Sequence, residues 1–388
     1  MSNPGDAPPL AVSLDVTAIP MAAAGAGQYA LEIARALDRR DDVSITLLTR
    51  NVDTARWRDH APGASVVPCA PGPRPLRIAW EQVGLPRRLR SLPVVVHHGL
   101  HYTMPERSRV PVVVTVHDCT FFDHPEWHQQ AKVRFFRRAI KVAARRAAVV
   151  VCVSDATAER FGELCHPTAR IIVAPHGIDR DRFGVAEPAP GSDAAALARL
   201  GIDDDRPLVV FVGTLEPRKG VAGLVAAFDR VADRHGDAVL VLAGQHGWGH
   251  ELDALNETKH RDRVVVTGYV PTGTVPALLR RARAVAYPSL DEGFGLPAFE
   301  ALACGAPLVT TTDTPMASVA GDAALLVAPG DVDELAGALD TLLTGDAQRE
   351  VRRQAGLERV SGLTWEHSAG LHMEAYRTAV ERNGLKKT

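Results

Sequence analysis

The sequence predicts an α/β protein built from two doubly wound, Rossmann-like domains. Short apolar, β-branched runs alternate with longer amphipathic stretches, as expected for parallel strands buried under crossover helices. This alternation occurs twice along the 388 residues, and a segment rich in Pro, Gly and Ala separates the two series. The length and the 46% hydrophobic content are sufficient for two cores of ordinary size.

The first series predicts a domain over residues 1–180. Its expected strands are Leu10–Val16, Val43–Thr49, Val94–His97, Val112–His117, Val149–Val153 and Ile171–Ala174. The expected helices include Gln28–Leu37, Trp127–Arg146 and Asp155–Leu164. Ser154 is the expected N-cap of the last of these helices.

The second series follows a connecting segment, Arg182–Gly191, and predicts a domain over residues 181–364. Its expected strands are Leu208–Gly213, Ala238–Ala243, Arg263–Thr267, Ala284–Pro288, Leu308–Thr311 and Ala323–Val327. Its expected helices lie near Val221–Arg234, Val275–Arg281, Pro297–Ala303 and Val332–Leu342. Because ligands of open α/β sheets bind beyond the carboxyl ends of the strands, we expect the function in βα loops that face a cleft between the domains.

Composition and charge exclude several classes of function. The net charge of −2 gives no overall attraction to nucleic acid. The five cysteines show no CxxC or Cys/His spacing, which argues against a disulfide framework or a zinc site and favours a reducing cytoplasm. The segment Met1–Leu10 lacks the basic and apolar regions of a secretion signal, and no run approaches the roughly 20 apolar residues that span a bilayer. We therefore expect a cytoplasmic protein.

The most informative segment is Asp291–Glu300, which follows a predicted strand. Pro297 in the first turn and Gly305 beyond the last turn bracket a short helix. Gly293 and Gly295 precede this helix, where the lack of a Cβ lets a ligand approach the backbone amides. The N-terminus of a helix with bare amides is an anion site.

Two carboxylates belong to the same segment. Glu292 precedes the helix and Glu300 lies one turn into it. Carboxylates suit hydroxyl groups, such as those of a ribose or a sugar ring, so the segment as a whole predicts a nucleotide-sugar site. For either glutamate alone, a solvated side chain in a glycine-rich turn is the simpler interpretation.

A second segment, Gly213–Gly220, also lies between a predicted strand and a predicted helix. Its adjacent cations, Arg218 and Lys219, can neutralise a diphosphate and stabilise a leaving group without a metal. Exposed charges of a first helical turn are the alternative. Because cations are mildly unfavourable at a helix start, a bound anion explains their position better.

Two segments of the first half carry weaker signals. Gly25–Tyr29 has close-approach glycines but does not complete the G-x-G-x-x-G fingerprint, which lowers the odds of a nicotinamide or flavin enzyme. His117 and Asp118 end a predicted strand, so that His117 either bonds a sugar hydroxyl or has a structural role, while Asp118 either joins it or caps the next turn. The cluster of His97, His98 and His101 matches no metal motif and suits acceptor binding or loop structure.

Together and in this order, these segments resemble the retaining glycosyltransferases of family 4, especially the mannosyltransferase-like members. Glu292 and Glu300 match the E-x7-E motif of that family, and Gly213–Gly220 matches its G-x-L-x-P-x-K-G loop. Gly25–Tyr29 and the His117-Asp118 pair match two further motifs. Additional similarity is found at Trp80–Gln82, Pro175–Asp179 and Thr364-Trp365.

The resemblance implies a GT-B architecture with the nucleotide sugar held mainly by the second domain and the acceptor by the first. It also implies that a helix over residues 365–388 crosses back onto the first domain. Arg218 and Lys219 would hold the diphosphate, and Glu300 the ribose. Glu292 would hold the donor sugar, and His117 would contact that sugar near the reacting carbon.

The remaining expected site residues fall into two groups. Those on the donor side are Gly25, Gly27, Gly213, Thr214, Gly268, Tyr269, Val270, Gly293, Phe294, Gly295 and Leu296. Those on the acceptor side are Tyr29, Trp80, His98, Tyr102 and Asp118. Many relatives carry Arg where this chain has Thr214, so Arg218 and Lys219 are expected to bind the donor phosphates without help from a third cation.

The expected activity is metal-independent transfer of a hexose with retention, and GDP-mannose and a lipid-linked or glycan acceptor are the leading substrates. A basic predicted helix within Lys132–Arg146 suggests either a solvated face or peripheral docking on anionic lipid. Two rival functions remain open: a sugar-nucleotide epimerase of the same fold, and a non-catalytic nucleotide-sugar-binding subunit of a glycan-assembly complex.

Overall fold

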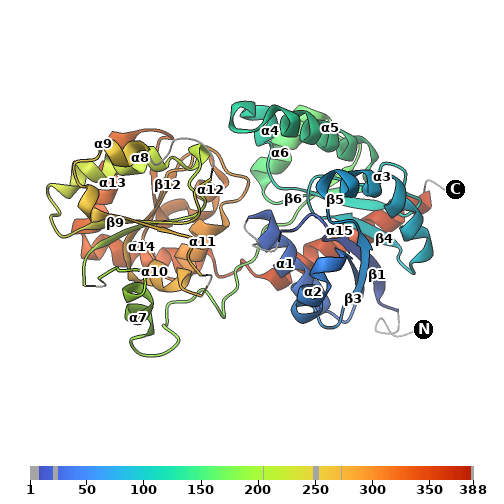
Figure 1. Cartoon of the computed structure of the whole chain (residues 1–388), viewed down its shortest axis with the longest axis horizontal. Helices are drawn as coiled ribbons and strands as arrows, with labels where there is room; N and C mark the ends of the chain where they lie inside the picture. The colour runs from blue at the N-terminus through green and yellow to red at the C-terminus, as the bar shows by residue number, and fades with distance from the viewer. Residues whose placement is uncertain (1–7, 21–24, 204, 248–252, 272, 386–388) are drawn as a thin grey trace. The chain divides into compact units, whose positions relative to one another are not determined.

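The computed structural model describes residues 8–20, 25–203, 205–247, 253–271 and 273–385. Within these residues the chain forms two compact units, each a parallel sheet covered by helices (Figure 1). The first unit comprises residues 1–177 and 364–388, and the second comprises residues 178–363. Two parallel α/β units are the fold class that the alternating pattern predicts.

The first unit is built on seven parallel strands in the order β3-β2-β1-β4-β5-β6-β7. These strands are β1 (Leu10–Asp15), β2 (Val43–Arg50), β3 (Ser65–Ala70), β4 (Val96–Gly99), β5 (Val112–Val116), β6 (Val149–Cys152) and β7 (Arg170–Val173). Its helices are α1 (Ala26–Asp38), α2 (Thr54–His60), α3 (Arg74–Ser91), α4 (Thr120–Asp123), α5 (Gln130–Arg146), α6 (Asp155–Cys165) and α15 (Trp365–Leu385).

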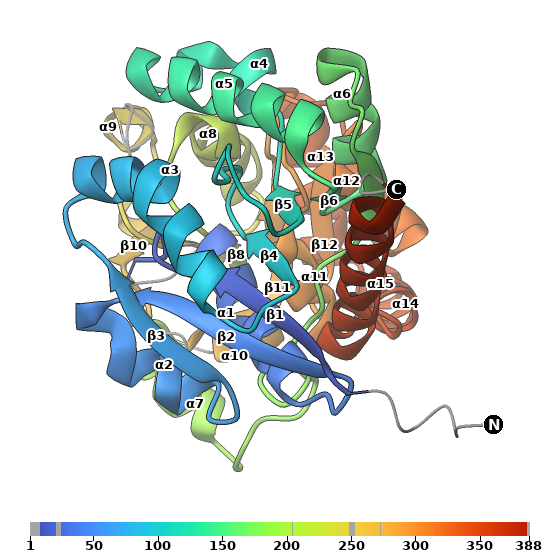
Figure 2. The same cartoon turned by 90° about the vertical axis from the view of Figure 1, so that its right-hand side faces the viewer.

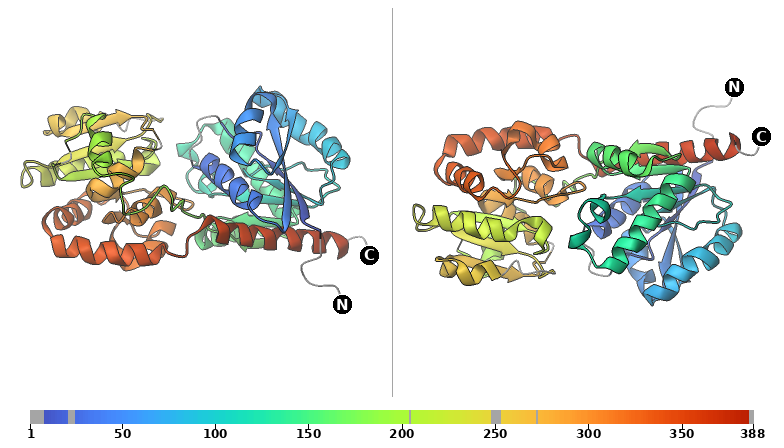
Figure 3. Two further views of the ribbon diagram at one scale, coloured as in Figure 1. Left: turned by 90° about the horizontal axis from the view of Figure 1, so that it is seen from below. Right: turned by 90° about the horizontal axis from the view of Figure 1, so that it is seen from above.

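The strands of the first unit bury side chains on both faces. Val113 packs into a core formed with α1, α2 and α15, whereas Val112 and Val114 pack into a core formed with α5 and α6. This division follows from the two-residue period of a strand, and it explains why β5 is continuously apolar. Figure 2 shows α3 and α5 of this unit, and Figure 3 shows α15 running along it.

The second unit has six parallel strands in the order β10-β9-β8-β11-β12-β13. These strands are β8 (Leu208–Val212), β9 (Val239–Ala243), β10 (Val264–Gly268), β11 (Ala282–Tyr287), β12 (Leu308–Thr311) and β13 (Ala324–Val327). Its helices are α7 (Ser192–Ala198), α8 (Val221–Ala232), α9 (Ala254–Glu257), α10 (Val275–Arg281), α11 (Leu296–Ala303), α12 (Pro315–Ala320), α13 (Val332–Thr344) and α14 (Asp346–Arg359).

Several local features differ from the sequence-based expectation. The structure adds β3 and α3, which contain Pro68 and Pro86 respectively. β3 is an edge strand, where proline costs no ladder hydrogen bond on the open side. The proposed connecting segment Arg182–Gly191 belongs to the second unit, where its Phe183 is buried.

Ser154 caps α6 as predicted, because its hydroxyl accepts the Thr157 amide at 3.1 Å.

The chain passes between the units at Gly177/Ile178 and again at Leu363/Thr364. Within the second unit, the Ile178 amide donates to the Leu363 carbonyl at 3.0 Å. Within the first unit, a Cβ at Gly177 would lie 2.1 Å from the backbone nitrogen of Trp365, so only glycine fits at this position. Among the described residues, no helix is both long enough and apolar enough to cross a membrane.

Candidate active site

In the second unit, two cations and one carboxylate meet beyond the carboxyl ends of β8 and β11. The 3₁₀ turn Pro217–Lys219 follows β8 and carries Arg218 and Lys219, while Glu292 lies in the loop after β11. Arg218 Nη1 donates to Glu292 Oε2 at 2.8 Å, and Lys219 Nζ donates to Glu292 Oε1. These three residues, which we call the Glu292 cluster, were predicted to belong to one site, and the structure brings them into contact.

Neighbouring groups hold the Glu292 cluster in place. The hydroxyl of Ser289 donates to Glu292 Oε1 at 3.1 Å, and Arg218 Nε pairs with Glu216 at 2.6 Å. The Leu290 amide donates to the Arg218 carbonyl at 2.8 Å, which joins the two loops through their backbones. The cations therefore approach the carboxylate from a loop whose path is fixed.

The Glu292 cluster is largely shielded from water, with exposed side-chain fractions of 8% for Glu292 and 12% for Lys219. Burial alone would raise the pKa of Glu292, but Arg218 and Lys219 outweigh it and lower that pKa to about 2. Burial and the neighbouring Arg218 lower the pKa of Lys219, and Glu292 opposes this change. At neutral pH Glu292 is therefore ionised, and it sits where the two cations converge.

Two glycines with left-handed backbones shape this edge of the sheet. Gly220 has a φ of 66°, and a Cβ there would lie 2.2 Å from the carbonyl oxygen of Pro288. Gly295 has a φ of 83° and caps α11, and a Cβ there would lie 2.1 Å from Cγ of Met316. Both positions require glycine, because a side chain would add a clash to an unfavourable backbone conformation.

The other predicted donor residues surround the same strand ends. Gly293, Phe294 and Leu296 lead into α11, with Phe294 buried against Phe299 at a ring-centroid distance of 4.9 Å. Glu300 lies in α11 near Tyr287. Burial raises the pKa of Tyr287, and the negative charge of Glu300 raises it further.

Gly213 and Thr214 follow β8 directly, and the Gly213 amide donates to the Ala243 carbonyl at 2.9 Å. Gly268 ends β10, which is two strands from β8 in the sheet. The two residues that follow Gly268 differ in exposure: Tyr269 is 60% exposed, whereas Val270 is buried.

In the first unit, His117 follows β5 and is buried. Its Nε2 lies 2.8 Å from the Leu100 carbonyl oxygen. Since a carbonyl can only accept, Nε2 carries the proton. Burial lowers the pKa of His117, so the ring is neutral and Nδ1 is its acceptor atom.

Two predicted acceptor residues, Tyr29 and His98, are fully buried in a polar network. Tyr29 Oη lies 2.7 Å from His372 Nε2 and 2.9 Å from Thr115 Oγ1. His98 lies 2.8 Å from Thr115 Oγ1 and 2.9 Å from Tyr376 Oη. Because His372 and Tyr376 belong to α15, the network binds that helix to the sheet, and neither Tyr29 nor His98 lines the pocket of this unit.

The structure places the remaining predicted residues of the first unit in different local surroundings. Asp118 accepts the Thr120 amide at 3.1 Å and the Thr120 hydroxyl at 2.8 Å, so it caps the next turn. Tyr102 is buried with a φ of 60°. Trp80 is half-buried, and a Cβ at Gly84 would lie 2.3 Å from its indole ring. Gly25 and Gly27 begin α1, and a Cβ at Gly25 would meet open space.

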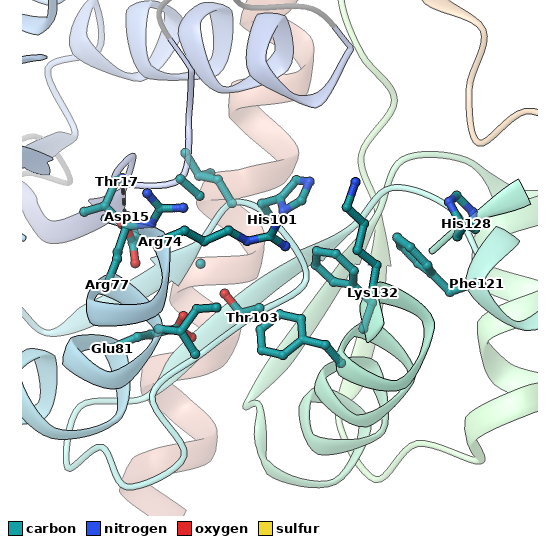
Figure 4. A pocket seen from close by; sticks show the side chains of 16 residues that line it. Asp15, Thr17, Arg74, Arg77, Glu81, His101, Thr103, Phe121, His128 and Lys132 are labelled. Carbon is teal, nitrogen blue, oxygen red and sulfur yellow. Dashed lines mark hydrogen bonds between the residues drawn. The ribbon is translucent and has the colours of Figure 1, made fainter. Parts of the chain in front are cut away.

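A cavity of about 370 Å³ lies between α3 and α5 of the first unit, and we call it the α3–α5 pocket (Figure 4). Figure 4 shows Asp15, Arg74, Arg77 and Glu81 on one side, and Phe121, His128 and Lys132 on the other. Of these residues, the sequence singled out Glu81 for similarity, and Arg74, Arg77 and Lys132 for their positive charge.

A helical signal for this pocket is present in the sequence. Arg74, Arg77, Ile78 and Glu81 have the spacing i, i+3, i+4 and i+7, which places them on one helical face once α3 is recognised. Pro75 and Pro86 argued against a helix here, although proline is favoured in the opening turn, where Pro75 lies.

Comparison with known proteins agrees with this architecture. Residues 23–182 match the family described as Glycosyltransferase Family 4, and residues 193–359 match the one described as Glycosyl transferases group 1. The chain is 31% identical over 316 residues to O-antigen chain mannosyltransferase B of Escherichia coli, which covers 78% of this chain and 81% of that protein. The chain belongs to glycosyltransferase family 4.

Further relatives and solved structures are consistent with membership of family 4. A D-inositol 3-phosphate glycosyltransferase of Xylanimonas cellulosilytica is 30% identical over 423 residues, with 98% of this chain and 99% of that protein covered. The structure of sucrose-phosphate synthase from Thermosynechococcus elongatus superposes with a TM-score of 0.76 at 21% identity, over 95% of this chain and 98% of that chain. This family 4 glycosyltransferase therefore has the GT-B type of fold.

Proposed function

We propose that this glycosyltransferase is a retaining, metal-independent hexosyltransferase that moves mannose from GDP-mannose to a lipid-linked or glycan acceptor. The Glu292 cluster carries the proposal, because two cations there converge on one buried anion. A diphosphate offers oxygens of the same charge to the same pair, to Arg218 as a fork and to Lys219 as a point charge. The name of the Escherichia coli relative supports mannose as the transferred sugar.

In the proposed reaction, the acceptor hydroxyl attacks the anomeric carbon from the face that the diphosphate leaves. The bond between that carbon and the phosphate oxygen breaks, the new glycosidic bond forms, and the departing diphosphate takes the hydroxyl proton. Arg218 and Lys219 stabilise the charge that develops on the leaving group. The proposal assigns Glu292 and the Nδ1 atom of His117 to hydroxyls of the donor sugar, and Glu300 to the ribose.

A thermal-shift panel of GDP, UDP, ADP and their sugars tests the donor. We expect GDP and GDP-mannose to raise the melting temperature most, because at equal concentration a ligand that binds the native state more tightly stabilises it more. Formation of an epimerised sugar nucleotide from donor alone would instead favour an epimerase. Failure to bind any nucleotide would favour a non-catalytic subunit of a glycan-assembly complex.

We also propose that α5 contacts anionic membranes. Its apolar face is buried through Val133, Phe136 and Ile140, whereas Lys141 and Arg145 on its other side are exposed. Basic side chains near a surface attract anionic lipid. Co-sedimentation with phosphatidylserine vesicles at low salt is the expected result, and no binding there would refute this contact.

A further inference from the structure

Three cations line the α3–α5 pocket without a direct ion pair among the described residues. Arg74 and Arg77 reach it from α3, and Lys132 reaches it from α5. In the part of the chain that the structure describes, none of these three side chains makes a hydrogen bond or an ion pair. Burial lowers the pKa of Arg77, the neighbouring Arg50 and Arg74 lower it further, and Asp15 and Glu81 oppose this change. An anion placed among these cations would relieve their mutual repulsion.

Carboxyl groups lie on the same side of the pocket as Arg74 and Arg77 (Figure 4). Glu81 is 8% exposed, and its Oε1 atom is buried with no hydrogen-bond partner among the described residues. Asp15 ends β1, and its Oδ1 accepts the Thr17 amide at 2.9 Å. A buried carboxyl oxygen without a partner costs free energy, and a hydroxyl group of a ligand would satisfy it.

The walls and the volume limit the kind of ligand. Phe121, Phe135 and Phe136 form an apolar wall, which suits the carbon face of a sugar ring or a polyol. The cavity of about 370 Å³ is at the lower end of the range for small-molecule sites, roughly 300–1,000 Å³. The pocket therefore offers cations, carboxyl groups and an aromatic wall.

We propose that the α3–α5 pocket is the acceptor subsite and binds a phosphorylated sugar or polyol. The phosphate lies among Arg74, Arg77 and Lys132, and hydroxyl groups lie at Asp15 and Glu81. This inference rests on the proposed function, since a transferase requires an acceptor. It adds that the acceptor carries phosphate, either as a soluble sugar phosphate or in a lipid-linked form.

Isothermal titration of the full chain tests this site with glucose 1-phosphate, with glucose and with a polyprenyl phosphate in neutral detergent micelles. We expect glucose 1-phosphate or the polyprenyl phosphate to bind at least 10-fold more tightly than glucose, and the tighter of the two identifies the source of the phosphate. Binding of neither phosphate compound would overturn the proposal.

Matched variants locate the binding. Arg77→Gln should weaken phosphate-dependent binding at least 10-fold, whereas Arg87→Gln, an equal loss of charge on the exposed side of α3, should leave it unchanged. Because Arg77 is half-buried, the exposed Lys132→Gln provides a second probe if the first variant folds poorly. Equal effects of Lys132→Gln and Arg87→Gln would overturn the assignment.

The donor site provides the control that separates this inference from the proposed function. GDP binding to Arg77→Gln should equal that of the wild type, because Arg77 lies in the first unit and the Glu292 cluster in the second. Transfer to a phosphorylated acceptor at an unchanged rate by Arg77→Gln would contradict the phosphate subsite and leave the transferase proposal intact. Absence of nucleotide binding by the wild type, with phosphate binding preserved, would contradict only the proposed function.

Discussion

The side chains of Glu292 in the second unit and Glu81 in the first are both largely shielded from water, yet their surroundings give them opposite protonation states. Arg218 and Lys219 touch Glu292 and lower its pKa to about 2 against the effect of burial. Burial raises the pKa of Glu81 to about 8, and the nearby Asp15 acts in the same direction. Burial disfavours the charged form in both places, so direct ion pairs decide which carboxyl is charged.

The comparison also separates two kinds of cation. Arg218 and Lys219 already hold an anion from their own chain, whereas Arg74, Arg77 and Lys132 hold none among the described residues. A ligand at the first site must displace a carboxylate from its cations, while a ligand at the second would meet cations without partners. The following four experiments test this difference, from the largest expected effect to the smallest.

The variant Lys219→Ala should have the largest effect. It removes one of two cations proposed to stabilise the leaving group, and we expect kcat to fall by roughly 100- to 1,000-fold, as for the loss of one stabilising donor. Steady-state transfer at saturating donor measures the effect, and a thermal melt checks folding. An unchanged kcat would show that Lys219 does not stabilise the leaving group.

The variant Glu292→Gln should destabilise the fold at neutral pH by roughly 3 kcal/mol, because it leaves Arg218 and Lys219 without their anion. The pKa of Glu292 is lower in the folded chain than its ordinary value of 4.5. Its contribution is therefore complete above pH 4.5 and lost as the pH falls toward 2. Urea denaturation should show the two proteins converging over that range, and parallel curves would contradict the ion-pair assignment.

The variant Glu81→Gln should have the opposite pH dependence. The folded chain retains the Glu81 proton up to a pKa of about 8, whereas the unfolded chain releases it near 4.5, so wild-type stability falls as the pH rises between these values. The groups that act on Glu81 include Asp15, Arg77 and Glu106. We expect the unfolding free energy of the variant to match that of the wild type at pH 4 and to exceed it by about 2 kcal/mol at pH 6.

Urea denaturation between pH 4 and pH 8 measures this effect, with Arg87→Gln as a charge-change control. A variant that is less stable than the wild type by a constant amount would show that Glu81 is ionised in the native state. The contrast with Glu292 would then disappear.

The variant Ser289→Ala should have the smallest effect. It removes one hydrogen bond of 3.1 Å from a hydroxyl to the Glu292 carboxylate and leaves both cations in place. We expect a loss of about 1.5 kcal/mol in unfolding free energy. A loss as large as that of Glu292→Gln would mean that the hydroxyl, rather than the cations, holds the carboxylate.

The sequence predicted the fold well because buried parallel strands are continuously apolar and rich in β-branched residues. β12 coincides with its predicted range, and most other expected strands differ by one or two residues. The elements that were not predicted have mixed signals. Pro68 interrupts the apolar run of β3, and Pro75 and Pro86 lie within α3.

The two candidate sites differed in how well the sequence alone could predict them. The Glu292 cluster lies in loops that directly follow strands, so sequence position alone places its residues at one edge of the sheet. The α3–α5 pocket depends on which faces two helices present, and one of those helices was not expected. Tyr29 and His98 were predicted for the acceptor, but the sequence gives no indication that α15 supplies their hydrogen-bond partners.

The attachment of α15 to the first unit has a consequence for biosynthesis. The second unit is one continuous stretch, residues 178–363, whereas the first unit obtains His372, Met373 and Tyr376 of its core from beyond that stretch. Domains generally fold as units during synthesis, the N-terminal one first. Here the ribosome completes the second unit before it completes the first. Tyr29 and His98 cannot form their hydrogen bonds to α15 until that helix has been translated.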